Sequence, residues 1–466
     1  MDPAHSSDLH IVMFPWFGLG HIMPFLHISN KLARKGHRIS FFVPAKTLSK
    51  IQHFNRFPRL ITFFPITVPH VDGLPVGAET TSDVPSPFYL LLMTAMDRTE
   101  RDVELLLLEL KPHIVFFDVA YWIPKLACKL GIKTVYFLVL NLVMAGYLSG
   151  CERAEQEMSI PFEKLLLQPP SSFPDSSIKL HLHETRFFVR RKTLGLGNDI
   201  KLDDRLRIGR AECDALVSKG CKEIEGPFVE FAERNIGKPM LLVGPVIPES
   251  PTNGLGLEDK WVNFLCGFEA GSVIYCGLGS ETVLKKDQFQ ELLLGFELSG
   301  YPFLAALKPP FGTETIEEAL PEGFEGRVKG RGVVHGGWIQ QQLILKHPSV
   351  GCYVTHCGYG SMMEGLVLNE SCQLVMIPFA NDQIYNARLI ANRLKAGVEV
   401  ERGEEDGFFT RESVCKAIRT VMEENYSEVG REIRANCSKL RELLLNKDTE
   451  SSYIDDLIKK LQDLMS

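Results

Sequence analysis

Residues 338–383 of the chain read WIQQQLILKHPSVGCYVTHCGYGSMMEGLVLNESCQLVMIPFANDQ. An apolar run, Val350–Val354, leads into a short polar turn at His356–Gly358, and a helical pattern follows with Glu364 in its first turns. A strand that runs through small residues into the start of a helix presents free backbone N–H groups and the positive end of the helix dipole, which together bind anions. His356 and Ser361 add side-chain donors, and Glu364 can accept hydrogen bonds from a sugar diol. The segment therefore predicts a site for a nucleotide diphosphate that needs no Walker-type lysine.

The same segment resembles the C-terminal signature box of plant UDP-sugar-dependent glycosyltransferases of small molecules. The matching positions are Trp338, Gln341, His347-Pro348, His356-Cys357-Gly358, Ser361, Glu364, Pro378 and Asp382-Gln383. The segment departs from the family pattern at Tyr359, where most members have Trp, at Gly360, where most have Asn, and around Asn369, where the loop is longer than usual.

The resemblance implies roles for individual residues of the donor site. The UDP-binding residues that it implies are Ser280, Trp338, Gln341, His356, Gly358, Gly360, Ser361 and Glu364. Trp338 would stack on uracil, and Gln341 and Glu364 would contact the ribose. Asp382 and Gln383 would hold the hydroxyl groups of the donor sugar. The sequence leaves open whether that sugar is glucose, xylose, rhamnose or galactose.

A second candidate site follows the first apolar run of the chain. His21 comes after a Gly18-Leu19-Gly20 turn, which we interpret as the sharp turn that His21 requires; Met23 replaces the third glycine of a dinucleotide fingerprint. Asp118 ends another apolar run, and ligands of open α/β sheets collect at the carboxyl ends of strands. A buried carboxylate at such a position needs a partner. In the resembled family the matching residues pair, so His21 is expected to be the general base and Asp118 to orient it.

Both halves of the chain alternate short apolar runs with helical patterns, which predicts an α/β protein with doubly wound parallel sheets. Together with the resemblance, this implies the GT-B fold, in which two Rossmann-like domains face a central cleft. We expect an acceptor-binding domain at 1–243, a Pro- and Gly-rich linker at 244–259 and a UDP-sugar-binding domain at 260–445. A C-terminal helix at 446–466 is expected to pack back on the N-terminal domain.

Net charge and composition argue against some classes of binding partner. The 466 residues carry a net charge of −7, which argues against nucleic acid or an anionic membrane as the main partner. The 11 cysteines form no C-x-x-C pair and are expected to be reduced thiols. The N-terminus is polar and acidic, unlike a signal peptide, and the apolar stretch Thr134–Leu148 is too short for a bilayer. We expect a cytoplasmic monomer without a membrane span.

Several segments resemble one clade of the family, which elongates sugar chains on flavonoid or anthocyanin glycosides and, in some members, on terpenoid glycosides. These segments are Phe14–Phe17, Cys221–Pro227, Lys238–Pro245 and His356–Met362. The resemblance implies inverting transfer from a UDP-sugar to the sugar of such a glycoside. No Asp-x-Asp motif is present, so no metal and no cofactor are expected. Candidate aromatic walls of the acceptor site are Trp16, Phe17, Tyr121, Phe187 and Phe188.

Three alternatives stay open from the sequence. One is an O-glucosyltransferase that uses the aglycone of a flavonoid or terpenoid. The others are a nucleotide-sugar epimerase with the GT-B fold and a catalytically inactive UDP-sugar sensor. The presence of both His21 and Asp118 favours a transferase over the last two.

Overall fold

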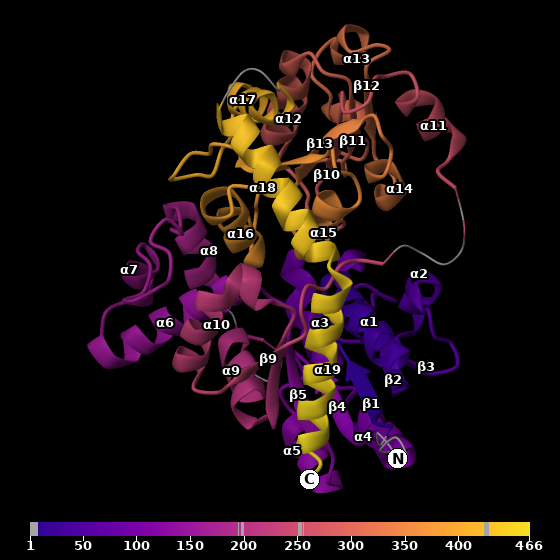
Figure 1. Ribbon diagram of the computed structural model, residues 1–466, viewed down its shortest axis with the longest axis vertical. Helices are drawn as coiled ribbons and strands as arrows, with labels where there is room; N and C mark the ends of the chain where they lie inside the picture. The colour runs from indigo at the N-terminus through magenta and orange to yellow at the C-terminus, as the bar shows by residue number, and fades with distance from the viewer. Residues whose placement is uncertain (1–7, 194, 197–199, 250–253, 255, 424–427) are drawn as a thin grey trace. The chain divides into compact units, whose positions relative to one another are not determined.

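The computed structural model describes residues 8–193, 195–196, 200–249, 254, 256–423 and 428–466 (Figure 1). The chain divides into two compact units, each built around a parallel sheet. Unit 1 consists of Met1–Gly150, Val189–Gly254 and Lys447–Ser466, and unit 2 consists of Cys151–Phe188 and Leu255–Asn446. The α/β class and the doubly wound parallel sheets predicted from the sequence are confirmed.

The sheet of unit 1 has the order β3-β2-β1-β4-β5-β8-β9, and all its neighbouring strands are parallel. Its strands are β1 (His10–Phe14), β2 (Arg38–Pro44), β3 (Ile61–Ile66), β4 (Ile114–Phe117), β5 (Lys133–Leu138), β8 (Ala215–Ser218) and β9 (Met240–Leu242). The strand order reverses between β1 and β4, where Phe14 is paired with Phe117. Such a switch point gathers the residues that follow both strands at one edge of the sheet.

Helices cover the two faces of this sheet, which explains why its central strands are continuous apolar runs. They are α1 (Leu19–Arg34), α2 (Leu48–Ile51), α3 (Tyr89–Asp97), α4 (Glu100–Leu110), α5 (Ile123–Leu130), α9 (Leu202–Glu212), α10 (Lys222–Ile236) and α19 (Lys447–Asp463). Two helices, α6 (Leu142–Met158) and α8 (Leu182–Thr193), contain the points where the chain passes between the units. A short antiparallel pair joins β6 (Gly195–Leu196) to β7 (Ile200–Lys201).

Unit 2 repeats the same topology with the order β12-β11-β10-β13-β14-β15. Its strands are β10 (Val273–Gly277), β11 (Phe303–Ala306), β12 (Gly332–His335), β13 (Val350–Thr355), β14 (Gln373–Met376) and β15 (Val398–Glu399). Its further helices are α7 (Phe162–Leu166), α11 (Asp259–Leu265), α12 (Lys286–Ser299), α13 (Phe324–Arg327), α14 (Gln341–Leu345), α15 (Tyr359–Val367), α16 (Asp382–Arg388), α17 (Arg411–Met422) and α18 (Glu428–Leu445). Helix α17 packs against α12, and α18 packs against α15 and α17. The switch point lies between β10 and β13, so the residues after β13 occupy the position where ligands bind.

The contact units differ from the expected domain limits in one segment. Residues 151–188 group with unit 2, whereas the sequence placed them in the domain 1–243. Contacts of this segment with unit 2 include those of Glu184, whose carboxylate accepts hydrogen bonds from Arg388 and Arg402, and of Ser177, whose carbonyl accepts one from Asn392. The predicted linker at 244–259 lies partly outside the described residues, at 250–253 and 255.

Helix α19 lies against α1 and β9 within unit 1. The buried Lys31 of α1 forms an ion pair with Glu450, at 2.8 Å. Tyr453 accepts a hydrogen bond from the backbone N–H of Lys222 at the start of α10 and donates one to Glu223, both at 2.8 Å. These contacts fasten the end of the chain to the elements that carry the N-terminal candidate site.

Among the helices that the structure describes, none has both the length and the apolar composition needed to cross a bilayer.

The buried His27 of α1 gives the stability of the protein a predictable pH dependence. Burial, with Lys31 and Arg56 nearby, lowers its pKa to about 3. The ring is therefore neutral in the folded protein, while in the unfolded chain it takes up a proton near pH 6.5. We expect no effect above that pH and a loss of about 2 kcal/mol in the free energy of unfolding by pH 5, because one pKa unit corresponds to about 1.4 kcal/mol. Urea unfolding at pH 7.5 and pH 5 measures this loss. In His27→Phe the pH-dependent loss should be smaller by that amount, and an equal loss in both proteins would contradict the prediction.

Candidate active site

His21 and Asp118 lie in contact at the switch point of unit 1. Asp118 Oδ2 is 2.6 Å from His21 Nδ1. Asp118 Oδ1 accepts hydrogen bonds from the backbone N–H groups of Trp16, at 2.8 Å, and Val119, at 2.6 Å. The side chain of Asp118 is 3% exposed and that of His21 is 27% exposed. A carboxylate held by two backbone donors assigns the proton of the imidazole to Nδ1, and Nε2 is then the ring nitrogen with a lone pair.

The turn before His21 forms without the left-handed backbone conformation that favours glycine. Gly18 precedes α1 with φ −127° and ψ 138°, and neither Gly18 nor Gly20 has a positive φ. The expected bend is present at Phe17 and Gly18, where the N–H of Gly18 donates to the carbonyl of Trp16 at 2.8 Å, but it requires no positive φ of either glycine. Gly18 instead permits a close approach, since a Cβ there would lie 3.0 Å from Thr81 Oγ1 and 3.3 Å from Trp16 Cδ1. A Cβ at Gly20 would meet no atom within 4 Å.

The start of α15 forms the centre of the predicted nucleotide site in unit 2. After β13, Cys357 adopts a left-handed conformation with φ 67°, and Gly358 precedes the helix with φ −61° and ψ 136°. Gly358 has no side chain with which to cap the helix, and no acidic residue occupies the first turn. Gly360 and Ser361 belong to that turn, and Gly360 is exposed. The backbone N–H groups of this turn and the helix dipole thus favour an anion.

The ring of His356 is enclosed by two glycines. A Cβ at Gly279 would lie 2.7 Å from His356 Cε1 and Nε2, and a Cβ at Gly358 would lie 2.6 Å from Nε2. Burial lowers the pKa of His356 to about 4, although a hydrogen bond with the backbone of Gly277 opposes this shift. The imidazole is therefore neutral near pH 7. A neutral imidazole has a single N–H, for which the backbone of Gly277 competes, and it offers a phosphate no full positive charge.

Glu364 lies one turn further along α15 and is held by two glutamines. Gln341 Nε2 donates to Glu364 Oε2 at 2.7 Å, and Gln342 Nε2 donates to Oε1 at 2.8 Å. Tyr275 donates to Gln341 Oε1 at 3.1 Å, and Gln341 Nε2 also lies 3.4 Å from Ser361 Oγ. Burial raises the pKa of Glu364. Each carboxylate oxygen retains acceptor capacity for a ribose hydroxyl, whereas both polar atoms of Gln341 are already bonded within the protein.

The remaining predicted donor residues differ in exposure and in their contacts. Trp338 is 82% exposed, which leaves its ring face available for a base, and Ser280 is exposed beside Gly279. Gln383 Oε1 accepts hydrogen bonds from the backbone of Phe379, at 3.0 Å, and Ala380, at 3.1 Å. The predicted sugar-binding residues thus belong to a loop that is closed by one of their own side chains.

Asn386 was not identified from the sequence. Its Nδ2 donates to the carbonyl of Cys357 at 2.9 Å and lies 3.4 Å from Asp382 Oδ2. It therefore joins the loop of Asp382 to the turn that precedes α15. Its place four residues after Asp382 on α16 was the available signal, because residues at that spacing share a helix face.

Comparison with known proteins identifies the family. Residues 329–433 match the UDP-glucoronosyl and UDP-glucosyl transferase family. A cyanidin 3-O-galactoside 2''-O-xylosyltransferase from Actinidia chinensis var. chinensis is 58% identical over 460 residues, covering 99% of both chains. An anthocyanidin 3-O-glucoside 2''-O-glucosyltransferase from Ipomoea purpurea is 51% identical over 462 residues, also covering 99% of both.

The chain belongs to this family of UDP-glycosyltransferases.

The fold agrees with this assignment. The crystal structure of Glycyrrhiza uralensis UGT73P12, complexed with glycyrrhetinic acid 3-O-monoglucuronide, superimposes with a TM-score of 0.80 at 21% identity. The superposition covers 98% of this transferase and 96% of that chain. The GT-B fold class is thereby confirmed, while the roles of single residues stay predictions.

The glycine at position 279 provides a test of the nucleotide site. Gly279 has φ 76°, and a Cβ there would collide with the ring of His356. We expect Gly279→Ala to weaken UDP binding about tenfold in isothermal titration. Gly300→Ala is the matched control, since Gly300 has φ 83° but a Cβ there meets no atom within 4 Å. Both variants carry the same type of backbone strain, of about 1 kcal/mol or more. Equal UDP affinity in the two variants would contradict a role for the His356 ring.

The five predicted acceptor residues differ in their exposure. The side chains of Trp16, Phe17 and Phe188 are buried, with 5%, 0% and 2% exposed. Tyr121 and Phe187 are half-buried. Tyr121 and Phe187 are therefore the two of these five whose rings can contact a ligand without repacking of a core.

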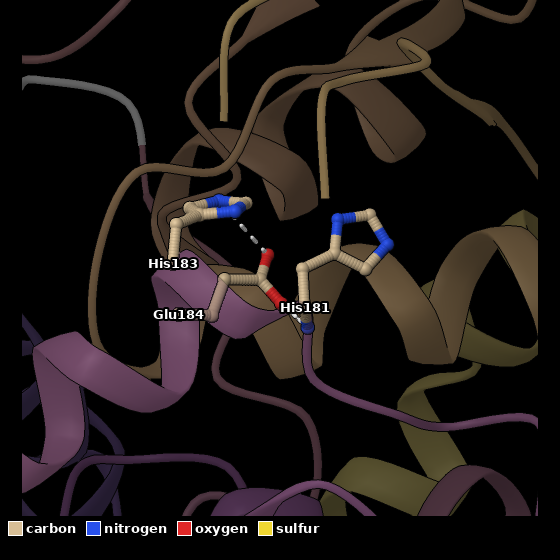
Figure 2. Close-up of side chains that lie close together, drawn as sticks. All are labelled: His181, His183 and Glu184. Atoms are coloured by element: carbon tan, nitrogen blue, oxygen red, sulfur yellow. Dashed lines mark hydrogen bonds and ion pairs between the residues drawn. The ribbon is translucent and has the colours of Figure 1, made fainter. Parts of the chain in front are cut away.

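His181, His183 and Glu184 form a further cluster in unit 2 (Figure 2). Their potential ligand atoms lie within 4.8 Å of one another, with the two rings on either side of the carboxylate. The carboxylate, however, already accepts hydrogen bonds from Arg388 and Arg402. A cation at this position would meet two guanidinium charges and a carboxylate whose oxygens are occupied. The cluster is therefore better suited to anchoring Glu184 than to binding a metal.

Proposed function

We propose that this transferase moves a sugar from a UDP-sugar, with inversion, to a sugar hydroxyl of a flavonoid or anthocyanin glycoside. The observation that carries the proposal is full-length identity of 58% and 51% to two enzymes whose names both specify an anthocyanin 3-O-glycoside as acceptor. Their names differ in the transferred sugar, which is xylose in one and glucose in the other. The acceptor class is thus better supported than the donor.

His21 and Asp118 support a one-step mechanism. His21 Nε2 takes the proton of the acceptor hydroxyl, whose oxygen forms a bond to the anomeric carbon as the bond to UDP breaks. Asp118 stabilises the imidazolium that results, through the hydrogen bond to Nδ1. The helix start at Gly358–Ser361, with His356 beside it, stabilises the negative charge that develops on the diphosphate. Attack opposite to the leaving group inverts the anomeric centre.

We further propose that the reaction needs neither a metal nor a cofactor, and that the protein acts as a cytoplasmic monomer. The helix-start anion site supports the first part, because it supplies charge stabilisation from the protein itself. The 11 cysteines are all free, and most are buried, which suits a reducing compartment.

An assay with a panel of donors and acceptors tests the proposed function. UDP-glucose, UDP-xylose, UDP-rhamnose and UDP-galactose are each supplied with cyanidin 3-O-galactoside, cyanidin 3-O-glucoside or the aglycone, with and without EDTA. We expect a glycoside to exceed the aglycone by about 100-fold or more in kcat/KM, because a site that hydrogen-bonds a substrate hydroxyl rejects an analogue without it. Fragmentation of the product should show a sugar-to-sugar bond, and EDTA should have no effect.

Each other result points to a specific alternative. A higher kcat/KM for the aglycone than for the glycosides would indicate an aglycone O-glucosyltransferase. Conversion of the UDP-sugar without acceptor would indicate an epimerase, and binding of UDP-sugar without turnover would indicate a sensor. Loss of activity in EDTA that manganese or magnesium restores would overturn the metal-free mechanism.

A further inference from the structure

We propose that Arg402 and Glu184 are positioning residues that link the donor-sugar loop, Pro378–Gln383, to the start of α8 and thereby determine how tightly the transferred sugar is held. The inference rests on the proposed function, since it takes Asp382 and Gln383 as the residues that contact the sugar. Arg402 and Glu184 lie outside the segment 338–383 and outside the His21–Asp118 pair.

Arg402 connects two segments through its guanidinium fork. One terminal nitrogen donates to the carbonyl of Pro378 at 2.7 Å. The other donates to Glu184 Oε1 at 2.7 Å and lies 3.3 Å from Glu399 Oε1. The side chain of Arg402 is 4% exposed and that of Glu184 is 1% exposed. A buried planar fork with fixed donor directions holds both partners in one geometry.

The loop on one side of this link has little freedom. Its first carbonyl, at Pro378, is fixed by Arg402. Its next two backbone N–H groups donate to Gln383 Oε1, and Asn381 adopts a left-handed φ of 52° immediately before α16. Movement of Arg402 would therefore shift the whole turn that presents Asp382 and Gln383.

The segment on the other side begins α8. Glu184 Oε2 accepts a hydrogen bond from the backbone N–H of His181 at 2.7 Å, which ties the chain just before the helix. One turn later, the ring of Phe188 lies 5.9 Å from that of Tyr385 on α16. The half-buried Phe187, a candidate acceptor contact, is the neighbour of Phe188. The ion pair and the ring contact thus join the same two segments.

The charges of this link balance within the protein. Arg388 donates to Glu184 at 3.1 and 3.2 Å and also pairs with Glu399, so that two arginines face two glutamates. Burial alone would raise the pKa of Glu184, but Arg388 and Arg402 outweigh it and lower the pKa. Buried ion pairs add little net stability, yet the loss of one partner leaves a costly unpaired charge. The ion pairs therefore stay formed, and they contribute a fixed geometry more than they contribute to the free energy of unfolding.

A fixed link between the two segments has a consequence for binding. Because Arg402 holds the loop and the start of α8 in one geometry, a substrate that binds to either segment favours the arrangement that the other substrate needs. Coupling of this kind is reciprocal, so each substrate raises the affinity for the other by the same factor. UDP, which lacks the transferred sugar, cannot make the contact with Asp382 and Gln383 that begins this coupling.

Arg402→Lys tests the link. Lysine keeps the positive charge, but its single ammonium group cannot reproduce the fork that serves Pro378 and Glu184 together. We expect the KM for the UDP-sugar to rise about tenfold, while the Kd for UDP, measured by isothermal titration, stays within about twofold of the wild-type value. Arg411→Lys is the matched control, because Arg411 makes a similar forked pair with Glu291 in unit 2 and no hydrogen bond to the donor-sugar loop. It should change neither constant.

Glu184→Gln provides the second variant and serves in place of Arg402→Lys if that protein does not fold. It should raise the KM for the glycoside acceptor and reduce the effect of bound donor on acceptor affinity, with UDP affinity unchanged. Equal losses of UDP and UDP-sugar affinity, or equal effects of Arg402→Lys and Arg411→Lys, would show a merely structural role and overturn the inference. Wild-type protein that transfers no sugar would instead overturn the proposed function.

Discussion

Replacement of His21 by alanine is expected to lower kcat by about 100-fold or more, the usual contribution of a positioned general base. The geometry gives the reason. Asp118 fixes His21 through Nδ1 at 2.6 Å, which leaves Nε2 to accept the proton of the attacking hydroxyl. Steady-state kinetics with saturating donor measure the change. The Kd for UDP should stay near the wild-type value, because the predicted nucleotide residues lie in unit 2 and His21 lies in unit 1.

His21→Asn separates proton transfer from positioning. Its side-chain amide can still donate a hydrogen bond to Asp118 but has no basic nitrogen. We expect the same loss of kcat as in His21→Ala. Near-normal turnover in either variant would exclude His21 as the base, and substantial recovery in His21→Asn alone would show that its role is structural.

Asp118→Asn is expected to be nearly as damaging although the imidazole stays in place. The carboxylate oxygen Oδ1 accepts from the backbone of Trp16 and Val119, so the asparagine oxygen should keep that position. Its amide nitrogen then replaces Oδ2 and faces His21 Nδ1 as a donor. The ring must carry its proton on Nε2 and can no longer act as a base. In a serine protease the analogous change lowers kcat by about 10⁴-fold, which shows that a tautomer change alone can remove most of the contribution of a general base.

A double variant makes this argument decisive. If Asp118 acts only through His21, then His21→Ala combined with Asp118→Asn should lose no more activity than His21→Ala alone, because residues that act as a unit are not additive. Multiplied losses would show that Asp118 has an independent role. Similar midpoints of urea unfolding for the three variants would confirm that the comparison concerns function.

The strand pattern could be predicted where the apolar runs were long and ended in a distinctive residue. The runs that became β1, β4 and β13 were recognised together with the residues that follow them, His21, Asp118 and His356. The rule that the carboxyl ends of parallel strands meet at one edge placed His21 and Asp118 at the same edge, and the family resemblance implied that the two side chains pair. Spacing alone carried no such information, because 97 residues separate the two.

Other elements gave weaker signals. Strands β8, β9 and β15 contain four, three and two residues, so they offer too little periodicity to distinguish them from loops. Strand β3 begins after a turn and includes Pro65, which is typical of an edge strand and masks the pattern.

The buried ion pairs could not be predicted from the sequence for a different reason. Arg205 is fully buried and makes a two-bond pair with Asp97, and Glu184 is held by Arg388 and Arg402. Charged residues in amphipathic helices are normally solvated, and nothing in one sequence reveals which of them has a distant partner. The contacts that join residues 151–188 to unit 2 include such pairs and could not be foreseen.

The place of α19 in unit 1 has a consequence for synthesis on the ribosome. The last residue of unit 2 is Asn446, so every part of that unit has been translated before α19 begins. Translation of unit 1 begins first but is complete only with Lys447–Ser466. Until these residues are made, the ammonium group of Lys31 lacks its ion-pair partner Glu450. The sheet whose strands emerge first is therefore the last to receive its full covering. The half that carries His21 is therefore completed only with the last residues to be translated.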